Sequence, residues 1–219
     1  MESLPILHKI NVLIHVVAGT VALLTGLMAL LVSKRKQIHK DIGRVFLLFL
    51  GVAIVTALFG VFIFSRNTFL LVITVLSGYL GYSGYRALQT KSNKPVLGDI
   101  ITAVAALLSV LYFVYYFKSV GMIWNPVIIY STVGYLVLVI SYDFIRYLIP
   151  AAAYANLWLY EHILKMVSAF SGLLSAFSGT VFPQYHPYSQ FLPSVLGGWV
   201  AIGFMISVYR KSRLKTVTK

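Results

Sequence analysis

Three histidines lie within long apolar stretches of the sequence or at their ends: His15, His39 and His162. An ionisable side chain in such a stretch is costly unless it faces other protein groups, so it marks a candidate functional site. A neutral imidazole can bind zinc or haem iron, and it can also relay a proton. His8 and His186 lie in a polar tail and a loop, where a solvated histidine needs no functional explanation.

The depth of each histidine predicts which of them can meet. His15 stands about 27 Å of helix, at ~1.5 Å per residue, from the charged end of its own stretch. His39 and His162 both stand at charged ends, so they can share a site that His15 cannot reach. We therefore predict a cofactor-binding site formed by His39, His162 and Met166, which would hold haem b or zinc. For a metal ion, Asp143 is the expected further ligand.

Charged residues at the level of this site predict an ion-pair network. The network is expected to contain Arg86, Asp143, Arg146 and Glu161. We expect Arg86 to pair with Asp143, because unpaired charges are costly inside a membrane bundle. Glu161 and Lys165 have i,i+4 spacing, which predicts a solvated salt bridge on the helix surface.

Small residues form two stripes at helical spacing. Gly19, Ala22 and Gly26 follow His15 on one helix face, and such a stripe lets a second helix approach closely. His15 is therefore expected to be a buried polar residue, hydrogen-bonded to that second helix. Gly43 lies one turn from His39 and leaves room beside the imidazole. The second stripe predicts a helix-packing surface and consists of Ser168, Gly172, Ser175 and Gly179.

The elements that must position these residues are membrane helices. Of the 219 residues, 59% are hydrophobic and 11% are charged, and the mean hydropathy is +0.88. Soluble domains carry about 25% charged residues, so a soluble monomer is excluded. The chain has no cysteine, which excludes disulfides, iron–sulfur clusters and thiolate zinc sites.

Seven apolar stretches are candidates for bilayer-spanning helices, which need about 20 residues each. The predicted fold class is all-α: a polytopic membrane protein with a seven-helix bundle and a single domain over residues 1–219. Short connections leave no room for a soluble domain. The predicted spans are residues 10–33, 45–65, 68–85, 100–117, 119–142, 157–182 and 191–209.

The basic residues predict an orientation. With seven spans, all of the 18 Lys and Arg residues except Lys9, Arg66 and Lys118 fall on one side of the membrane. Basic loops stay in the cytoplasm, so we expect the N-terminus outside and the C-terminus inside. The net charge of +13 then forms a cytoplasmic collar that faces anionic lipid headgroups rather than a nucleic acid.

Several groups of residues, spread over nearly the whole chain, form a pattern. They are His15, Gly19 and Gly26; His39, Gly43 and Arg44; Ser83, Gly84, Tyr85, Arg86 and Ala87; Asp143; and His162 and Met166. This pattern resembles an uncharacterised bacterial integral-membrane family, domain of unknown function 2306. The chain has Lys40 and Lys165 where the family pattern has arginine, so the basic character is kept. The resemblance implies seven helices, with histidines at helix ends, and a bacterial inner-membrane location; it implies no activity.

Two looser likenesses concern the metal chemistry. The chain is similar to cytochrome b561-type bundles, which hold haem between histidines on different helices, and this likeness implies one haem between His39 and His162. Seven-helix zinc hydrolases of the ceramidase and progestin-receptor kind use three histidines and an aspartate. Here only His39, His162 and Asp143 could gather in that way, and the Ser-x-x-x-His spacing of those enzymes is missing.

Three functions therefore stay open from the sequence. The leading hypothesis is a redox-type membrane protein that binds haem or a metal at His39 and His162. The first alternative is a small-molecule or proton-coupled transporter that uses His15 and Asp143. The second alternative is a zinc-dependent membrane hydrolase.

Overall fold

The computed structural model describes residues 3–64, 68–94, 96–121 and 126–217, which form eight α-helices and two 3₁₀ turns. Every predicted stretch overlaps one long helix, which confirms the all-α prediction. The fifth stretch was predicted to begin too early, because Ser119 belongs to α4 and α5 is described from Pro126 onward. The helices are α1 (Ser3–Leu31), α2 (Lys36–Phe62), α3 (Thr68–Thr90), α4 (Leu97–Val120), α5 (Pro126–Ile145), α6 (Ala151–Tyr154), α7 (Leu157–Val181) and α8 (Tyr188–Val217), and the 3₁₀ turns are η1 (Arg146–Leu148) and η2 (Pro183–Tyr185).

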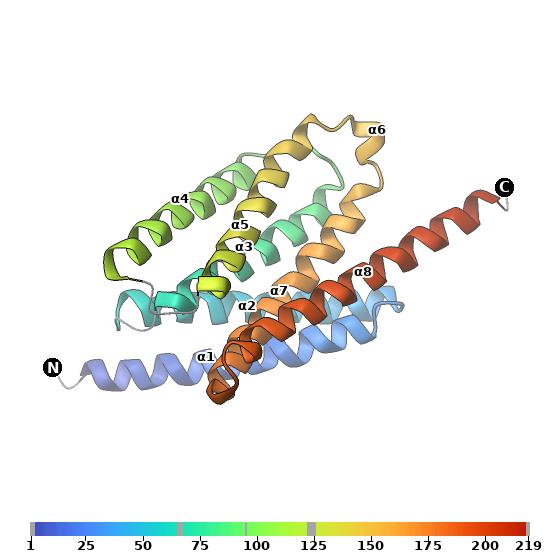
Figure 1. The fold of residues 1–219 in the computed structure, drawn as a ribbon. Coiled ribbons are helices and arrows are strands. Elements are labelled where there is room, and N and C mark those ends of the chain that lie inside the picture. The colour runs from blue at the N-terminus through green and yellow to red at the C-terminus, as the bar shows by residue number, and fades with distance from the viewer. Residues whose placement is uncertain (1–2, 65–67, 95, 122–125, 218–219) are drawn as a thin grey trace.

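The long helices alternate in direction along the bundle, with the N-terminus at one end and the C-terminus at the other (Figure 1). The α1–α2, α3–α4 and α5–α7 connections all lie at the end that also holds the C-terminus, which we call the basic end. Asn93, in the α3–α4 connection, donates hydrogen bonds to the carbonyls of Arg146 and Ile149 after α5. The basic loops of the sequence are thus gathered at one end.

Helix α3 is the central helix of the bundle. It packs against α2, α4, α5 and α7, and its Val72, Leu80 and Ala87 side chains are fully buried. At the periphery α1 packs on α2, and α8 packs on α7. The main apolar core therefore forms around α3 and also contains Phe46 of α2 and Leu136 of α5.

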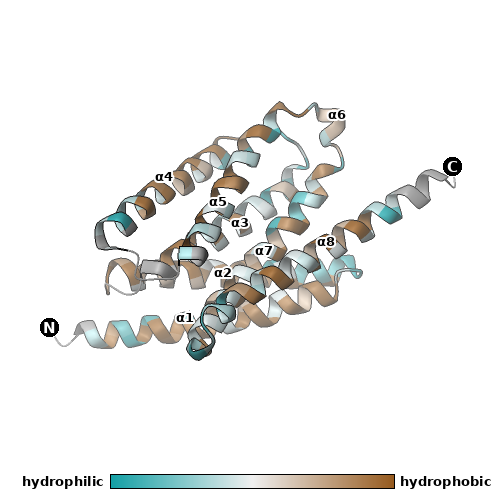
Figure 2. Cartoon of the chain, viewed as in Figure 1, coloured by the Kyte–Doolittle hydropathy of each residue, from teal (hydrophilic) through white to brown (hydrophobic). Residues whose placement is uncertain are grey.

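Six helices are long and apolar enough to cross a membrane: α1, α2, α4, α5, α7 and α8. Figure 2 shows hydrophobic residues along the helices and hydrophilic residues toward the helix ends. Large apolar side chains such as Leu13, Leu108 and Leu196 face outward and are exposed. This is the surface of a multi-pass membrane protein. Among the described residues α3 does not belong to these six; much of its Gly-, Ser- and Tyr-rich run packs against other helices.

The two small-residue stripes have different outcomes. The second is confirmed as a packing surface: a Cβ on Gly172 would lie 2.5 Å from Ser77 Oγ, and one on Gly179 would lie 2.5 Å from Gln190 Cγ. In the first stripe Ala22 is fully buried, and a Cβ on Gly26 would lie 2.5 Å from the Phe170 ring. The prediction was wrong for Gly19, which has no neighbouring atom within 4 Å of an added Cβ.

This contrast gives a matched pair of variants. We expect Gly26→Leu to destabilise the protein by about 1–3 kcal/mol, because the new side chain must displace the Phe170 and Phe46 rings. Gly19→Leu is the control, since it adds the same side chain in open space. Thermal unfolding in detergent measures both, and equal melting temperatures for the two variants would contradict the packing of α1 on α2 and α7.

Candidate functional site

The structure brings His39 and His162 together. His39 lies in the first turn of α2 and His162 in the second turn of α7, both at the basic end. Their ring centroids are 6.5 Å apart, and the ring planes are nearly perpendicular at 88°. The spacing lies well inside the limit of about 12 Å beyond which no single metal ion could bridge two imidazoles.

Each imidazole of this pair is oriented by a backbone carbonyl. The Nδ1 of His39 lies 2.9 Å from the carbonyl oxygen of Ala29, and the Nδ1 of His162 lies 3.0 Å from that of Gly84. A carbonyl oxygen can only accept, so each Nδ1 donates the hydrogen bond, and in the neutral ring Nε2 then keeps its lone pair. Metal-binding histidines are held in the same way, with the second ring nitrogen donating to a carbonyl or carboxylate.

Two glycines border the histidine pair. Gly43, one turn beyond His39, has no atom within 4 Å of an added Cβ, so this side of the imidazole has open space as expected. Gly84, whose carbonyl holds His162, is tightly packed instead. A Cβ there would lie 2.9 Å from Lys165 Cβ and 3.2 Å from the sulfur of Met166. The predicted cofactor residue Met166 therefore packs on α3 beside the carbonyl that orients His162.

Asp143 does not join the histidines. The described residues contain no group of three or more His, Asp or Glu side chains that could hold a metal ion, so the predicted metal set of His39, His162 and Asp143 does not form. The carboxylate of Asp143 is instead occupied by the ammonium of Lys165 and by Tyr79, which donates a hydrogen bond of 2.7 Å. The fully buried ammonium of Lys165 thus binds the carboxylate that a metal ion would have needed.

A cluster of four buried charges lies beside the pair, and we call it the charge cluster. It consists of Asp143, Arg146, Glu161 and Lys165, of which none is more than 5% exposed. Arg146 Nη1 lies 2.7 Å from Glu161 Oε2, and Arg146 Nε lies 3.5 Å from Asp143 Oδ1. Lys165 contacts Asp143 and lies 3.6 Å from Glu161 Oε2. Two cations thus neutralise two carboxylates inside the bundle.

Tyrosines complete the hydrogen bonding of the charge cluster. Tyr142 donates a 2.5 Å hydrogen bond to Glu161, and Arg146 donates one of 3.2 Å to the hydroxyl of Tyr154. Burial raises the pKa of the Tyr154 phenol, and the charge of Glu161 raises it further, so the hydroxyl stays protonated. A buried carboxylate needs such donors to offset its lost hydration.

Two predicted ion pairs were wrong. Arg86 does not pair with Asp143; its Nε lies 2.8 Å from Oδ1 of Asp99, in the first turn of α4. The Glu161–Lys165 pair is buried and shared with Arg146, although its spacing predicted a solvated pair. The sequence therefore did not reveal that Lys165 is buried or that Asp99 is the partner of Arg86. The available signal was that both are ionisable residues inside or beside apolar helices, which by default face protein groups.

His15 lies in a separate polar contact. Its Nδ1 lies 3.0 Å from the carbonyl of Ala53 and 3.0 Å from the hydroxyl of Thr56, both on α2. Asn11, one turn earlier, donates to the carbonyl of Thr56. This is the expected hydrogen bond to a neighbouring helix. His15 and Asp143 have different partners, and nothing in the described contacts joins them.

Comparison with protein-family models, with curated proteins and with solved structures finds no match to this chain.

Proposed function

We propose that this chain is a redox-type membrane protein that binds one haem between His39 and His162. The observation that supports it is the pair itself: two imidazoles 6.5 Å apart, each with Nδ1 fixed on a carbonyl and Nε2 free. Two imidazoles that bind one iron place their nitrogens about 4 Å apart, judged from metal–nitrogen bonds of ~2.0–2.1 Å. The ring centroids are 6.5 Å apart, so the two imidazoles are near enough to hold one such group between them.

The number of protein ligands favours haem over zinc. A catalytic zinc site takes three protein ligands, and the described residues offer only two here. Haem supplies most of the ligands of its iron itself, so His39 and His162 would be enough to hold it. When bound, it would supply one-electron chemistry. At Gly43, one turn from His39, no atom lies within 4 Å of an added Cβ, so the described structure leaves this side of His39 open.

The role of the polypeptide in this proposal is to hold and tune the two ligands. The carbonyls of Ala29 and Gly84 fix the ring orientations and increase the basicity of the free nitrogens. The charge cluster of α5, η1 and α7 is neutral as a whole, so it holds α7 in place without adding a net charge near His162.

The visible spectrum and metal content of the detergent-purified protein test this function. We expect a Soret band and one iron per chain when the cells are supplied with haem. A colourless protein with no bound iron would refute the haem proposal. A colourless protein with one zinc per chain would favour the hydrolase alternative.

For the topology we propose seven crossings in a bacterial inner membrane, with the N-terminus outside and the C-terminus in the cytoplasm. The 23 residues of α3 make a helix about 34 Å long, enough for a bilayer core of about 30 Å. Counting α3 as a crossing keeps Lys34–Arg44 and the C-terminal basic residues on one side, as the basic end of the bundle also does.

Fusions at the C-terminus check this orientation. A green fluorescent protein fused after Lys219 should fluoresce, and alkaline phosphatase fused there should be inactive, because that enzyme requires export. An active phosphatase and a dark fluorescent protein would contradict the seven-crossing topology.

A further inference from the structure

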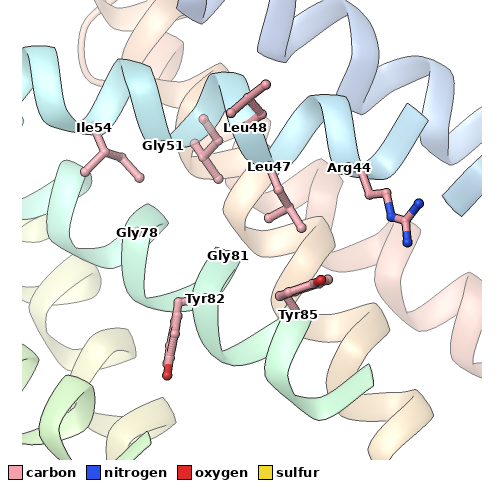
Figure 3. A pocket seen from close by; sticks show the side chains of 10 residues that line it. Arg44, Leu47, Leu48, Gly51, Ile54, Gly78, Gly81, Tyr82 and Tyr85 are labelled. Atoms are coloured by element: carbon pink, nitrogen blue, oxygen red, sulfur yellow. The ribbon is translucent and has the colours of Figure 1, made fainter. Parts of the chain in front are cut away.

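A groove on the outer surface runs between α2 and α3 (Figure 3). It has a volume of ≈ 390 Å³ and is mostly apolar, with its polar and charged side chains toward one end. Figure 3 shows Ile54 at one end and Arg44 at the other, with Tyr85 of α3 beside Leu47. A second hollow of ≈ 450 Å³ shares Leu47, Leu48 and Gly51 and continues along α2 to Thr56. The second hollow is lined by α2 alone, so we call the first hollow, between the two helices, the α2–α3 groove.

Glycines shape this groove. Gly78 and Gly81 let α3 approach α2 closely, because an added Cβ would lie 3.2 Å from Ile54 and 2.9 Å from Leu50. Gly51 instead has no atom within 4 Å, so the wall at this position is open. The two helices therefore pack tightly at the floor of the groove, at Gly78 and Gly81, and the groove is open at Gly51.

The dimensions of the groove match one lipid chain. From Arg44 to Ile54 the groove follows α2 for about 15 Å, at ~1.5 Å per residue. One leaflet occupies half of a hydrocarbon core of about 30 Å, so an acyl chain in the groove would reach close to the middle of the bilayer.

The charge of the groove is concentrated at one end. The Arg44 side chain is 61% exposed, and its salt bridge to Asp41 is long, at 3.8 Å, and also exposed, so an anion can compete for the guanidinium. Lys36 and Lys40 precede it on the same helix. Long basic side chains reach from a membrane helix toward the headgroup level. A positive end joined to an apolar groove complements a molecule with an anionic head and a long apolar tail.

We propose that the α2–α3 groove is a specific binding site for one anionic phospholipid, with its phosphate at Arg44 and an acyl chain over Gly51. This site is independent of the histidine pair and does not rest on haem binding. It also differs from the general attraction of the basic collar for lipid headgroups, because it depends on the Arg44 side chain and on the open space at Gly51.

Native mass spectrometry of the full chain, with added phosphatidylglycerol or phosphatidylcholine of equal chain length, tests the site. We expect wild-type protein to retain one phosphatidylglycerol in preference to phosphatidylcholine. Arg44→Gln should weaken phosphatidylglycerol binding about fivefold and remove this preference, because one basic residue near a membrane surface contributes roughly that factor. Gly51→Leu should reduce the binding of both lipids, because leucine fills the groove.

Matched controls separate the groove from nonspecific effects. Arg210→Gln removes an exposed basic residue at the same end of the bundle, and Gly203→Leu adds a side chain on an exposed face of α8 with no neighbour within 4 Å. Both should bind lipid as wild type does. The proposal is overturned if Arg210→Gln lowers binding as much as Arg44→Gln, if Gly51→Leu binds normally, or if the retained molecule is a quinone or another uncharged lipid.

Discussion

Replacing Lys165 with methionine is expected to destabilise the protein by about 3–5 kcal/mol, because it leaves a buried carboxylate without its cation. Methionine keeps most of the side-chain volume, so the loss reports mainly the charge. Asp143 would then depend on Tyr79 and on Arg146 Nε at 3.5 Å, while Arg146 is already bound to Glu161. Thermal unfolding in detergent measures the change.

Two further variants show whether charge balance is the cause. Lys94→Met removes an exposed lysine at the same end of the bundle and should leave the melting temperature nearly unchanged. The double variant Asp143→Asn with Lys165→Met removes one charge of each sign and should be more stable than Lys165→Met alone. If Lys165→Met melts like Lys94→Met, the charge cluster is not sealed from water in the way the structure describes.

Replacing either His39 or His162 with alanine is expected to weaken haem binding by more than about 100-fold. Loss of an outer partner of a metal ligand alone costs about 10- to 100-fold, and these variants remove the ligand itself. The absorbance of the Soret band per chain, measured on purified protein, gives the occupancy. The two variants should behave alike, because in the proposed site each histidine would supply one of two ligands to the same iron.

His15→Ala is the matched control for these variants. His15 also lies in an apolar helix and has its Nδ1 3.0 Å from a carbonyl, but it is hydrogen-bonded to Ala53 and Thr56 of α2. We expect this variant to lose stability and to keep its haem. Equal loss of haem in all three variants would mean that the histidines act through folding, and the shared site would then be wrong.

The depth of a side chain along the membrane was predictable from the sequence, but the rotation of each helix about its own axis was not. Counting residues from the charged ends placed His39 and His162 at one level, and the structure indeed sets them 6.5 Å apart. Which neighbour a side chain faces depends on helix packing, which no count of residues provides. Arg86 therefore pairs with Asp99, at the start of the next helix, although Asp143 lies at a similar depth.

The burial of Lys165 shows the same limit. Its i,i+4 spacing from Glu161 is typical of exposed helix pairs, and the spacing does not reveal that α3 and α5 cover this face of α7. Gly19 and Gly26 give a parallel case. Both belong to one small-residue stripe, yet only Gly26 meets the Phe170 ring, because α7 crosses α1 at that level and not at Gly19.

The electron paramagnetic resonance spectrum of the ferric protein tests most directly whether both histidines bind one iron. Iron with two imidazole ligands is low-spin, and iron that has lost one of them is expected to become high-spin. We expect a low-spin signal in wild type and in His15→Ala, and the loss of that signal in both His39→Ala and His162→Ala. A high-spin signal in wild type, or a low-spin signal that survives either substitution, would contradict the shared site.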